Sequence, residues 1–463
     1  MFGGSSNCWG GWCKQFSEED FEARDWLPNS GWPFHKNHLA PFYDRAEELL
    51  ELKPAGYKPD VWLTHKNQAN LQILPNTSSR VASQIAHLAP RRQLGRSYRD
   101  AIHSAGNVQV VLNANVGHIQ AAASGQSIQS VSLQHLNGNR AKVKAKYFIL
   151  ACGGIENARL LLHSNDVQKD GLGNQNDVVG RYFMDHPRLE IGDIAITEPG
   201  FSNNFYDVNY GYFFSSAVGT LAMAPATMRE KGIANAGFYL NSEYSNPEEE
   251  SIKAFHKFTF SLHKRQYDDI SFRDLFRLAT SPVSVTKHVI GKIFRPESLL
   301  FSRRIMILFE PAPNPNSRIT LSEETDRLGL RKPSLDWRLT DYDKNTILQS
   351  RRIVADEIKN AGIGQVSFDQ PDDKFEFPPD ITYCWHHMGT TRMHEDPKQG
   401  VVDQHCRVHG LENLFVAGSS VFPTASSDMP TLTIIALAMR LADHLKRLHE
   451  TPRQPISSHA TAK

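Results

Sequence analysis

The sequence predicts a mixed α/β fold, and three features of the chain support that prediction. An apolar strand pattern at 147–152 runs directly into two glycines and then a helix-compatible stretch. The alternating runs 127–134 and 141–150 are joined by Asn137-Gly138, which is a strong signal of a β-hairpin. Residues 190–380 differ in character, with aromatic-rich segments, further strand patterns and an amphipathic helix. This middle region is therefore predicted to form a separate sheet-plus-helix domain.

In the N-terminal part we expect a glycine turn, a helix and a sheet. Residues 3–12 form a turn-rich cluster with no strand in front of it, so the opening resembles the middle of a domain. Apolar residues at a 3.6-residue period predict a helix over 41–52. Strand patterns follow at 108–112 and 116–119. Together with the hairpin they predict an antiparallel meander that ends in the apolar strand before Gly153.

Further elements are predicted along the rest of the chain. Strands are expected at 304–309 and 317–321, and an amphipathic helix at 347–361. A short strand at 413–416 should end in a Gly-Ser-Ser turn. The last helix has Pro430 in its first turn, where the missing N–H of proline costs nothing. Because this helix is apolar on nearly all faces, it is predicted to be buried.

Length and composition limit the classes of protein that fit. The 463 residues suit about two or three domains with ample core. Lys and Arg number 51 against 50 Asp and Glu, which removes the composition-level reason to propose a nucleic-acid partner or an anionic-membrane surface. The five cysteines are scattered and no secretory signal opens the chain, so we expect reduced thiols and a cytoplasmic location. No apolar run approaches the roughly 20 residues of a membrane span.

Two adjacent histidines, His386 and His387, are the first candidates for chemistry. They lie among aromatic residues just before a glycine turn. A neutral imidazole is the usual side chain for taking a proton from an alcohol, because its ordinary pKa of about 6.5 is close to the operating pH. Adjacent strand residues point to opposite faces, so only one of the two should face a given pocket. For either residue, the alternative is an ordinary core or surface histidine.

Two helix starts are candidates for binding negative charge. Gly153-Gly154 places a helix N-terminus at the end of a strand, where α/β folds bind phosphates and cofactors, although a plain structural turn fits the same residues. The helix from Pro430 presents unpaired N–H groups and the positive end of its dipole, although it could simply close the domain. No Cys/His spacing matches a zinc site, so no metal ligands are predicted.

Three motifs together resemble the glucose-methanol-choline (GMC) family of flavin-dependent alcohol oxidoreductases. They are the opening run 2–11 (FGGSSNCWGG), the run 151–161 (ACGGIENARLL), and the order of motifs from His386 through 401–410 (VVDQHCRVHG) to 430–433 (PTLT). The resemblance spans essentially the whole chain. It implies an FAD cofactor and a split FAD-binding domain of GMC type with an inserted antiparallel-sheet substrate domain.

The resemblance also implies domain limits. Residues 1–190 and 381–450 correspond to the first and last parts of the FAD-binding domain, 191–380 to the substrate-binding domain, and 451–463 to a flexible tail. The family places a strand, a G-x-G-x-x-G turn and a helix ahead of the opening glycine loop. The sequence contains no such unit, so we expect the chain to lack the N-terminal ADP-binding βαβ unit.

Site residues follow from the same resemblance. His386 matches the catalytic histidine of the family, which accepts the hydroxyl proton of the alcohol. The positions that match cofactor contacts are Gly4, Ser5, Asn7 and Cys8 in the loop that wraps the flavin, Val116 at the adenine, Gly153, Gly418 and Ser419 at the phosphate and ribityl region, and Pro430 and Thr431 at the pyrimidine edge of the flavin.

Two positions depart from the family pattern. Where the family usually has Asn or His just before Pro430, this chain has Met429, and a thioether cannot donate a hydrogen bond to a substrate hydroxyl. The neighbouring Asp428 could substitute for that group, so both residues join His386 as candidate catalytic residues. Some relatives carry a histidine bonded covalently to the flavin at the position of Cys8, which we expect to pack against the ring.

The leading hypothesis is an FAD-dependent oxidoreductase that converts the CH–OH group of an alcohol, sugar or polyol to a carbonyl. Hydride would pass to flavin N5, with His386 as the base. The expected partners are a small-molecule alcohol and an electron acceptor that the sequence does not name, and a dehydrogenase is preferred over an oxidase. The alternatives are a non-catalytic or truncated chain of the GMC fold that does not hold FAD alone, and a flavin lyase.

Overall fold

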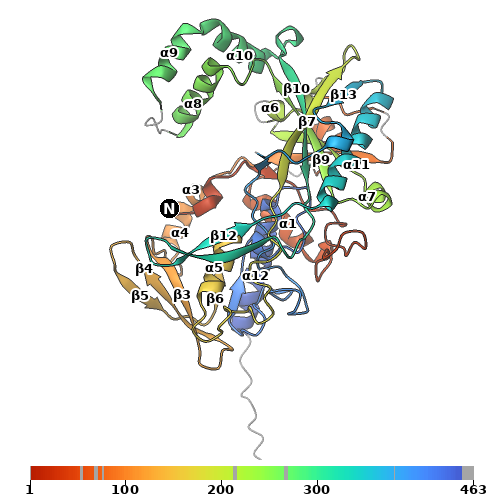
Figure 1. The fold of residues 1–463 in the computed structure, drawn as a ribbon. Helices are drawn as coiled ribbons and strands as arrows, with labels where there is room; N and C mark the ends of the chain where they lie inside the picture. Colours follow the sequence, from red (N-terminus) through yellow and green to blue (C-terminus); the bar gives the residue numbers. More distant parts are fainter. Residues whose placement is uncertain are drawn as a thin grey trace, which may run out of the picture.

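The structure is a computed structural model that describes residues 2–52, 56–66, 71–75, 78–211, 216–264, 270–379 and 381–450. The tail predicted at 451–463 lies outside the described residues. Figure 1 shows three parts: a large sheet with a long helix on one face, an α/β part with smaller sheets that contains both ends of the described chain (the smaller part, named for its sheets), and an arm of three helices that projects away from both.

The largest sheet has eight strands, and every pairing in it is antiparallel. Its order is β1-β2-β8-β9-β10-β7-β13, and β14 also pairs with β7. The bounds are Trp12–Cys13 (β1), Val81–Leu88 (β2), Pro187–Ile196 (β7), Ala217–Met223 (β8), Ala236–Glu243 (β9), Ser302–Phe309 (β10), Gly364–Phe368 (β13) and Thr382–Tyr383 (β14). The strand predicted at 304–309 is confirmed as the greater part of β10.

One face of this sheet packs on the long helix α11 (Asp341–Asn360), as Figure 1 shows. The helix begins with a capping box between Thr340 and Asp343, which fixes its start six residues before the predicted one. Its buried Ile347 and Val354 belong to one apolar cluster with Phe238 and other side chains of the sheet. The helix predicted at 347–361 is therefore confirmed.

The smaller part joins segments that are far apart in the sequence. Strand β6 (Phe148–Leu150) leads into helix α5 (Gly153–His163) and pairs in parallel with β15 (Leu414–Val416). Helix α12 (Thr431–Glu450) packs on α1 (Ala40–Leu49), where the hydroxyls of Tyr43 and Thr433 lie 2.8 Å apart. These contacts confirm the predicted strand, glycine turn and helix, and they bring the last segment of the described chain onto the first.

Some elements differ from the sequence predictions. Residues 108–112 are not a strand, because their apolar side chains are exposed and lie outside the sheet. The predicted meander consists of β3 (Asn115–Ala121), β4 (Ile128–Gln134) and β5 (Arg140–Val143). The strand predicted at 141–150 is two strands, since β5 pairs with β4 while β6 turns to β15.

The prediction that the last helix, α12, is buried is wrong in part. Leu432, Ala436 and Leu437 are buried, but Ala438 is exposed, so one face of the helix is open rather than none. The strand predicted at 317–321 is the first part of a hairpin, β11 (Arg318–Thr325) with β12 (Arg331–Asp336).

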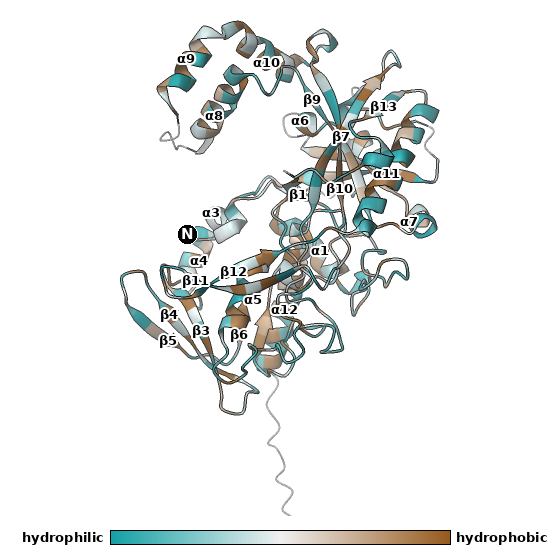
Figure 2. Cartoon of the chain, viewed as in Figure 1, coloured by the Kyte–Doolittle hydropathy of each residue, from teal (hydrophilic) through white to brown (hydrophobic). Residues whose placement is uncertain are grey.

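The arm consists of α8 (Glu250–Lys264), α9 (Phe272–Thr280) and α10 (Pro282–Phe294). Figure 2 shows strongly hydrophobic residues along these helices, although the arm stands clear of the sheet. Shorter helices complete the described chain: α2 (Pro59–Lys66), α3 (Leu94–Ser97), α4 (Arg99–Ser104), α6 (Val208–Tyr210) and α7 (Pro225–Lys231). Within the described residues, no helix combines the length and apolarity needed to cross a membrane.

Candidate active site

His386 lies against a second histidine that the sequence did not single out. The Nδ1 atoms of His186 and His386 are 2.8 Å apart, and the two rings meet edge to face. His186 is completely buried just before β7, whereas His386 follows β14, which pairs with that strand. The pairing of β14 with β7 therefore brings together two imidazoles that are 200 residues apart.

The hydrogen bonds assign the proton positions of both rings. Nε2 of His186 lies 2.7 Å from the carbonyl oxygen of Ser426 and 3.2 Å from that of Ala425. A carbonyl only accepts, so Nε2 of His186 carries the hydrogen. In the neutral ring Nδ1 of His186 is then an acceptor, and Nδ1 of His386 must donate to it. The lone pair of His386 is therefore on Nε2, where it can accept a proton.

Both rings are held neutral at pH 7. Burial lowers the pKa of His186 to about 4. Burial, with smaller contributions from His186 and His387, holds the pKa of His386 well below its ordinary value. Desolvation disfavours the charged form of an imidazole, which explains both directions. An uncharged imidazole with a free Nε2 is the form that a general base requires.

The backbone around the pair is unusual. Trp385 and Ser426 both adopt positive φ, 61° and 56°, which is uncommon for residues with side chains. In this conformation the Ser426 carbonyl reaches His186, and the backbone N–H of His386 donates to the Asp185 carboxylate at 2.8 Å. Burial raises the pKa of Asp185 to about 6. Strained residues that persist beside polar side chains are typical of functional sites.

His387 points to different neighbours. Its ring packs on Phe183 with 5.7 Å between ring centroids, and its Nε2 lies 3.8 Å from a carboxylate oxygen of Asp185. Its carbonyl oxygen accepts from the Ser419 hydroxyl at 2.7 Å. A Cβ on Gly154 would lie only 2.4 Å from that oxygen, so a glycine is required there. The side chains of the two adjacent histidines thus contact different residues.

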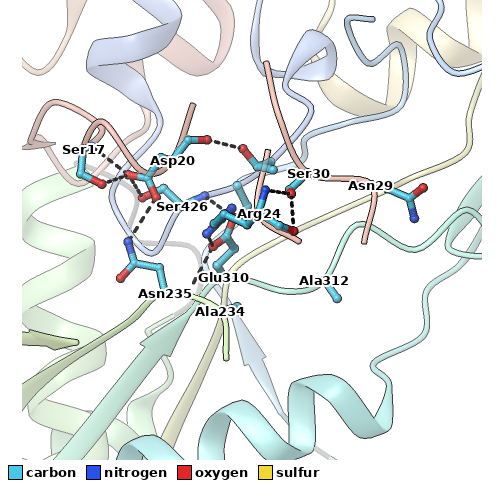
Figure 3. Close-up of polar contacts among 12 residues, drawn as sticks. Ser17, Asp20, Arg24, Asn29, Ser30, Ala234, Asn235, Glu310, Ala312 and Ser426 are labelled. Atoms are coloured by element: carbon cyan, nitrogen blue, oxygen red, sulfur yellow. Dashed lines mark hydrogen bonds and ion pairs between the residues drawn. The ribbon is translucent and has the colours of Figure 1, made fainter. Parts of the chain in front are cut away.

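A buried polar network holds the Ser426 loop (Figure 3). Arg24 makes two 2.7 Å bonds to Glu310, and both side chains are almost fully buried. Glu310 also accepts from the backbone N–H of Ser426 at 3.3 Å, and the Ser426 hydroxyl donates to Asp20 at 2.9 Å. Because the Ser426 carbonyl fixes His186, this network supports the histidine pair from behind.

Asp428 and Met429 lie in different surroundings from each other. The Asp428 carboxylate pairs with Lys14 at 2.5 Å, and the same Lys14 ammonium also donates to Gln84. Met429 packs against the apolar group of Tyr239, Met306 and Leu308. Both line a pocket over the large sheet, together with Trp12, Gln84, Ala86, Thr220, Ala222, Gly237, Tyr239, Leu308 and Ser427. This pocket combines an aromatic wall with a few polar groups.

The opening glycine loop is a single 3-10 turn anchored to α3. Gly4, Ser5 and Asn7 lie in this turn, Gly4–Asn7, and Cys8 follows it. The Asn7 side chain donates to the Phe2 carbonyl at 2.7 Å and accepts from the Gly95 N–H at 2.9 Å. Gly4, Ser5 and Cys8 are exposed, so this side of the loop is accessible to a ligand.

The two glycine turns predicted at the cofactor lie side by side. Gly153 and Gly418 follow the parallel strands β6 and β15 at the same end, where Ala417 N–H donates to the Leu150 carbonyl at 2.7 Å. Both have positive φ, and a Cβ on either would meet no atom within 4 Å. The carboxyl ends of parallel strands, with a helix N-terminus beside them, are where α/β sheets bind nucleotides.

The remaining predicted cofactor positions are spread around this end of the smaller part. Val116 is half-buried in β3, opposite Leu133 of β4. Ser419 opens the turn that bonds to His387. Pro430 is buried and Thr431 half-buried at the start of α12.

A flavin nucleotide fits this surface on two observations. Open space faces the two positive-φ glycines at the start of α5 and after β15. In the opening loop, the buried indole N–H of Trp9 has no hydrogen-bond partner among the described residues, and a buried donor of this kind normally has one.

For a metal ion, the described residues contain no group of three or more His, Cys, Asp or Glu side chains placed to hold it.

The sequence did not predict His186, Lys14 or Gln84 as site residues. A signal for His186 is present in Asp185-His186-Pro187, where a histidine precedes the proline that opens a strand. Its partner His386 is 200 residues away, so only the sheet pairing reveals the contact.

Comparison with known proteins identifies the family of the chain. Family models described as GMC oxidoreductase match residues 1–188 and 313–438. The fold is also that of a solved fungal aryl-alcohol oxidase, with a TM-score of 0.56 at 15% identity over 97% of this chain and 86% of that one. The two family models thus define the chain as an oxidoreductase of the flavin-dependent class. Within that class it belongs to the GMC oxidoreductase family, which implies a flavin cofactor.

Two curated relatives are similar over most of the chain. The fructose dehydrogenase large subunit of Gluconobacter japonicus is 25% identical over 72% of this chain and 53% of its own length. The 2-methyl-1,2-propanediol dehydrogenase of Mycolicibacterium austroafricanum is 26% identical over 70% of this chain and 52% of its own. The chain thus spans about half the length of these relatives.

Proposed function

We propose that the chain acts as an FAD-dependent oxidoreductase that oxidises the CH–OH group of a small alcohol, sugar or polyol to a carbonyl. The observation that carries the proposal is the neutral, oriented His386, whose Nδ1 donates to His186 and whose Nε2 keeps its lone pair. A substrate hydroxyl would give its proton to this atom. Bound FAD supplies the two-electron acceptor for such an oxidation.

The cofactor would be held by residues of the smaller part. The opening turn at Gly4–Asn7, the start of α5 at Gly153 and the turn at Gly418-Ser419 would contact it. The start of α12, with Pro430 and Thr431, would place the positive end of the helix dipole beside negative charge on the bound group.

The domain division is proposed with two additions. Residues 1–190 and 381–450 would form the FAD-binding parts and 191–380 the substrate part. However, β1 and β2 of the first segment join the large sheet. Conversely, Arg159 of α5 donates to the Arg331 carbonyl and to Asp326, which ties the β11–β12 hairpin to the FAD-binding part.

The substrate class rests on the pocket and on the relatives. Trp12 and Tyr239 offer aromatic faces, and Gln84, Asp428 and Lys14 offer hydrogen-bonding groups beside them. Such a mixture suits a small polyhydroxylated or diol substrate. The names of the two relatives, a fructose dehydrogenase and a propanediol dehydrogenase, support the same class.

A second candidate function is a protein of the same fold without alcohol turnover. Met429 favours it, because this side chain packs in an apolar group and cannot donate a hydrogen bond to a hydroxyl. The absorbance of the purified chain separates the two: flavin bands that bleach on addition of an alcohol or sugar support the oxidoreductase, whereas flavin bands that no such compound bleaches support the second candidate.

The decisive experiment is flavin reduction by stopped flow in flavin-loaded protein. His386→Gln should slow reduction by the best alcohol at least about a hundredfold, since a general base contributes that much. His387→Gln is the matched control, because this ring faces Phe183 and Asp185 rather than His186, and it should change the rate only a few fold. An unchanged rate in His386→Gln would overturn the assignment of the base.

A further inference from the structure

The arm of α8, α9 and α10 presents large apolar side chains to solvent. Among the described residues, every phenylalanine with a largely exposed side chain lies between residues 260 and 301. Phe272 is 83% exposed, Phe294 75% and Phe276 60%. None of the three apolar clusters of the structure includes a residue of 250–294. Ile252 and Ala254 at the start of α8 are buried, but the large apolar side chains of α9 and of the outer face of α10 do not contribute to the core of this chain.

Helix α9 has the reverse polarity of an ordinary surface helix. Phe272, Leu275 and Phe276 follow the i, i+3, i+4 spacing of one helix face, and all three are exposed. Asp274, on the opposite side, is buried and pairs with Lys257 of α8 at 2.8 Å. A soluble helix normally buries its apolar face and exposes its charged one, so the environment of α9 is incomplete without an apolar contact.

Helix α10 continues this pattern. Val283, Ile290 and Phe294 lie on one face at i, i+7 and i+11, and all are exposed. The opposite side meets the body of the protein through small and polar groups. A Cβ on Gly291 would clash with Tyr244, and the buried His288 bonds to the Ser245 hydroxyl at 2.6 Å. The arm is thus fixed at its base by close packing and turns its apolar face outward.

The arm is also strongly basic. Residues 250–295 contain nine Lys and Arg against four Asp and Glu, a net charge of +5. Two of these cations, Lys292 and Arg295, pair with Glu243 and Asp207 of the body, and the excess that remains is positive. The whole chain has a net charge of +1, so the remainder is acidic overall. Arg273 and Lys287 are exposed on the same helices as the phenylalanines. The near-zero charge of the chain conceals this local concentration.

We propose that the α8–α10 arm is a docking surface for an anionic lipid bilayer, on which it lies as an interfacial helical unit. Short helices with aromatic and aliphatic residues on one face and Lys or Arg beside them bind at the level of the lipid headgroups. The positive charge of the arm attracts anionic lipid, and the phenylalanines enter the acyl boundary. The position of the arm at one extremity of the molecule (Figure 1) leaves it free to meet a flat surface.

Vesicle flotation of the flavin-loaded chain tests the proposal. With vesicles of phosphatidylcholine and phosphatidylglycerol in equal parts, the chain should float with the lipid, and with pure phosphatidylcholine it should float much less. The triple variant Phe272→Ser, Phe276→Ser, Phe294→Ser should lower the partition coefficient at least about tenfold. Arg273→Glu with Lys287→Glu should lower it as well, and high salt should do the same, since salt screens exposed charges.

The matched control removes the same number of exposed apolar side chains elsewhere: Val108→Ser, Val111→Ser, Leu112→Ser. It should float like the unmodified chain. Flavin reduction by alcohol should be unchanged in the triple phenylalanine variant, so this test is independent of the proposed catalytic function. Failure of the unmodified chain to bind the anionic vesicles would overturn the proposal. A dimer by light scattering that the phenylalanine variant dissociates would instead assign the face to a second copy of the chain.

Discussion

The Nδ1 atoms of His186 and His386 lie 2.8 Å apart, and the Ser426 carbonyl behind His186 fixes which of the two donates. In the proposed reaction His186 would be a positioning residue, because it holds the proton on Nδ1 of His386 and so keeps Nε2 free. This contact gives one of the 20 histidines in the chain the tautomer that the proposed role of base requires.

Replacement of His186 should separate orientation from mere packing. His186→Phe removes the acceptor and should slow flavin reduction about tenfold to a hundredfold, because the wrong tautomer of His386 becomes populated. His186→Asn places an amide oxygen near the former Nδ1 and should restore much of the rate. Stopped-flow rates across pH give the readout. Equal loss in both variants would contradict a tautomer role.

The low pKa of His186 predicts an acid-dependent loss of stability. Its pKa falls from 6.5 to about 4 on folding, so between these pH values the unfolded state binds more protons than the folded state. The contribution of His186 is complete above pH 6.5 and is lost as the pH falls toward 4, by about 3 kcal/mol.

Denaturant unfolding of the chain and of His186→Asn at about pH 7.5, above this window, and at about pH 4.5, near its lower end, measures most of this effect. The stability of the unmodified chain should drop more than that of the variant between the two pH values. An identical drop in both proteins would show that His186 titrates normally.

The buried pair of Arg24 and Glu310 should be important for folding stability. Arg24→Met leaves the Glu310 carboxylate buried without its cation, which costs about 3–5 kcal/mol. The exposed pair of Arg45 and Asp443 is the control, since Arg45 is 45% exposed and Arg45→Met should cost less than about 1 kcal/mol. The free energy of unfolding measures both. A similar small loss in the two variants would mean that the network around Ser426 does not depend on the buried pair.

Local patterns predicted much of the fold from the sequence. The strand, glycine turn and helix at β6–α5 were predictable because consecutive residues carry the whole signal. The run 108–112 was misread since alternation alone does not show whether a partner strand exists. Pairings between distant segments could not be predicted, because no local sequence pattern shows that β2 joins the large sheet.

The same distinction between local and long-range signals applies to the residues of the candidate site. His386 was found because its motif is continuous in sequence. His186, Lys14 and Gln84 were missed because they acquire their roles only through pairings between distant segments, such as β14 with β7. The outward polarity of α9 was likewise hidden, since an i, i+3, i+4 pattern does not reveal which face meets the protein.

Met429 offers a final test, at the position where the family usually has Asn or His. Its neighbours Tyr239, Met306 and Leu308 form an apolar cluster, but Met429 is only half-buried and also lines the pocket beside Asp428. Met429→Asn therefore mainly loses apolar packing and should cost about 1 kcal/mol of stability. Met429→Leu nearly conserves volume and should cost less than this.

Thermal or denaturant unfolding of these two variants ranks their stability. The rate of flavin reduction by alcohol in the same preparations shows whether the substrate still reacts. Because the cluster supplies packing rather than hydrogen bonds, we expect Met429→Asn to be the less stable variant and Met429→Leu to reduce flavin at nearly the unmodified rate. If Met429→Asn instead were as stable as Met429→Leu, the amide would have found a hydrogen-bonding partner, and the pocket at this position would be polar.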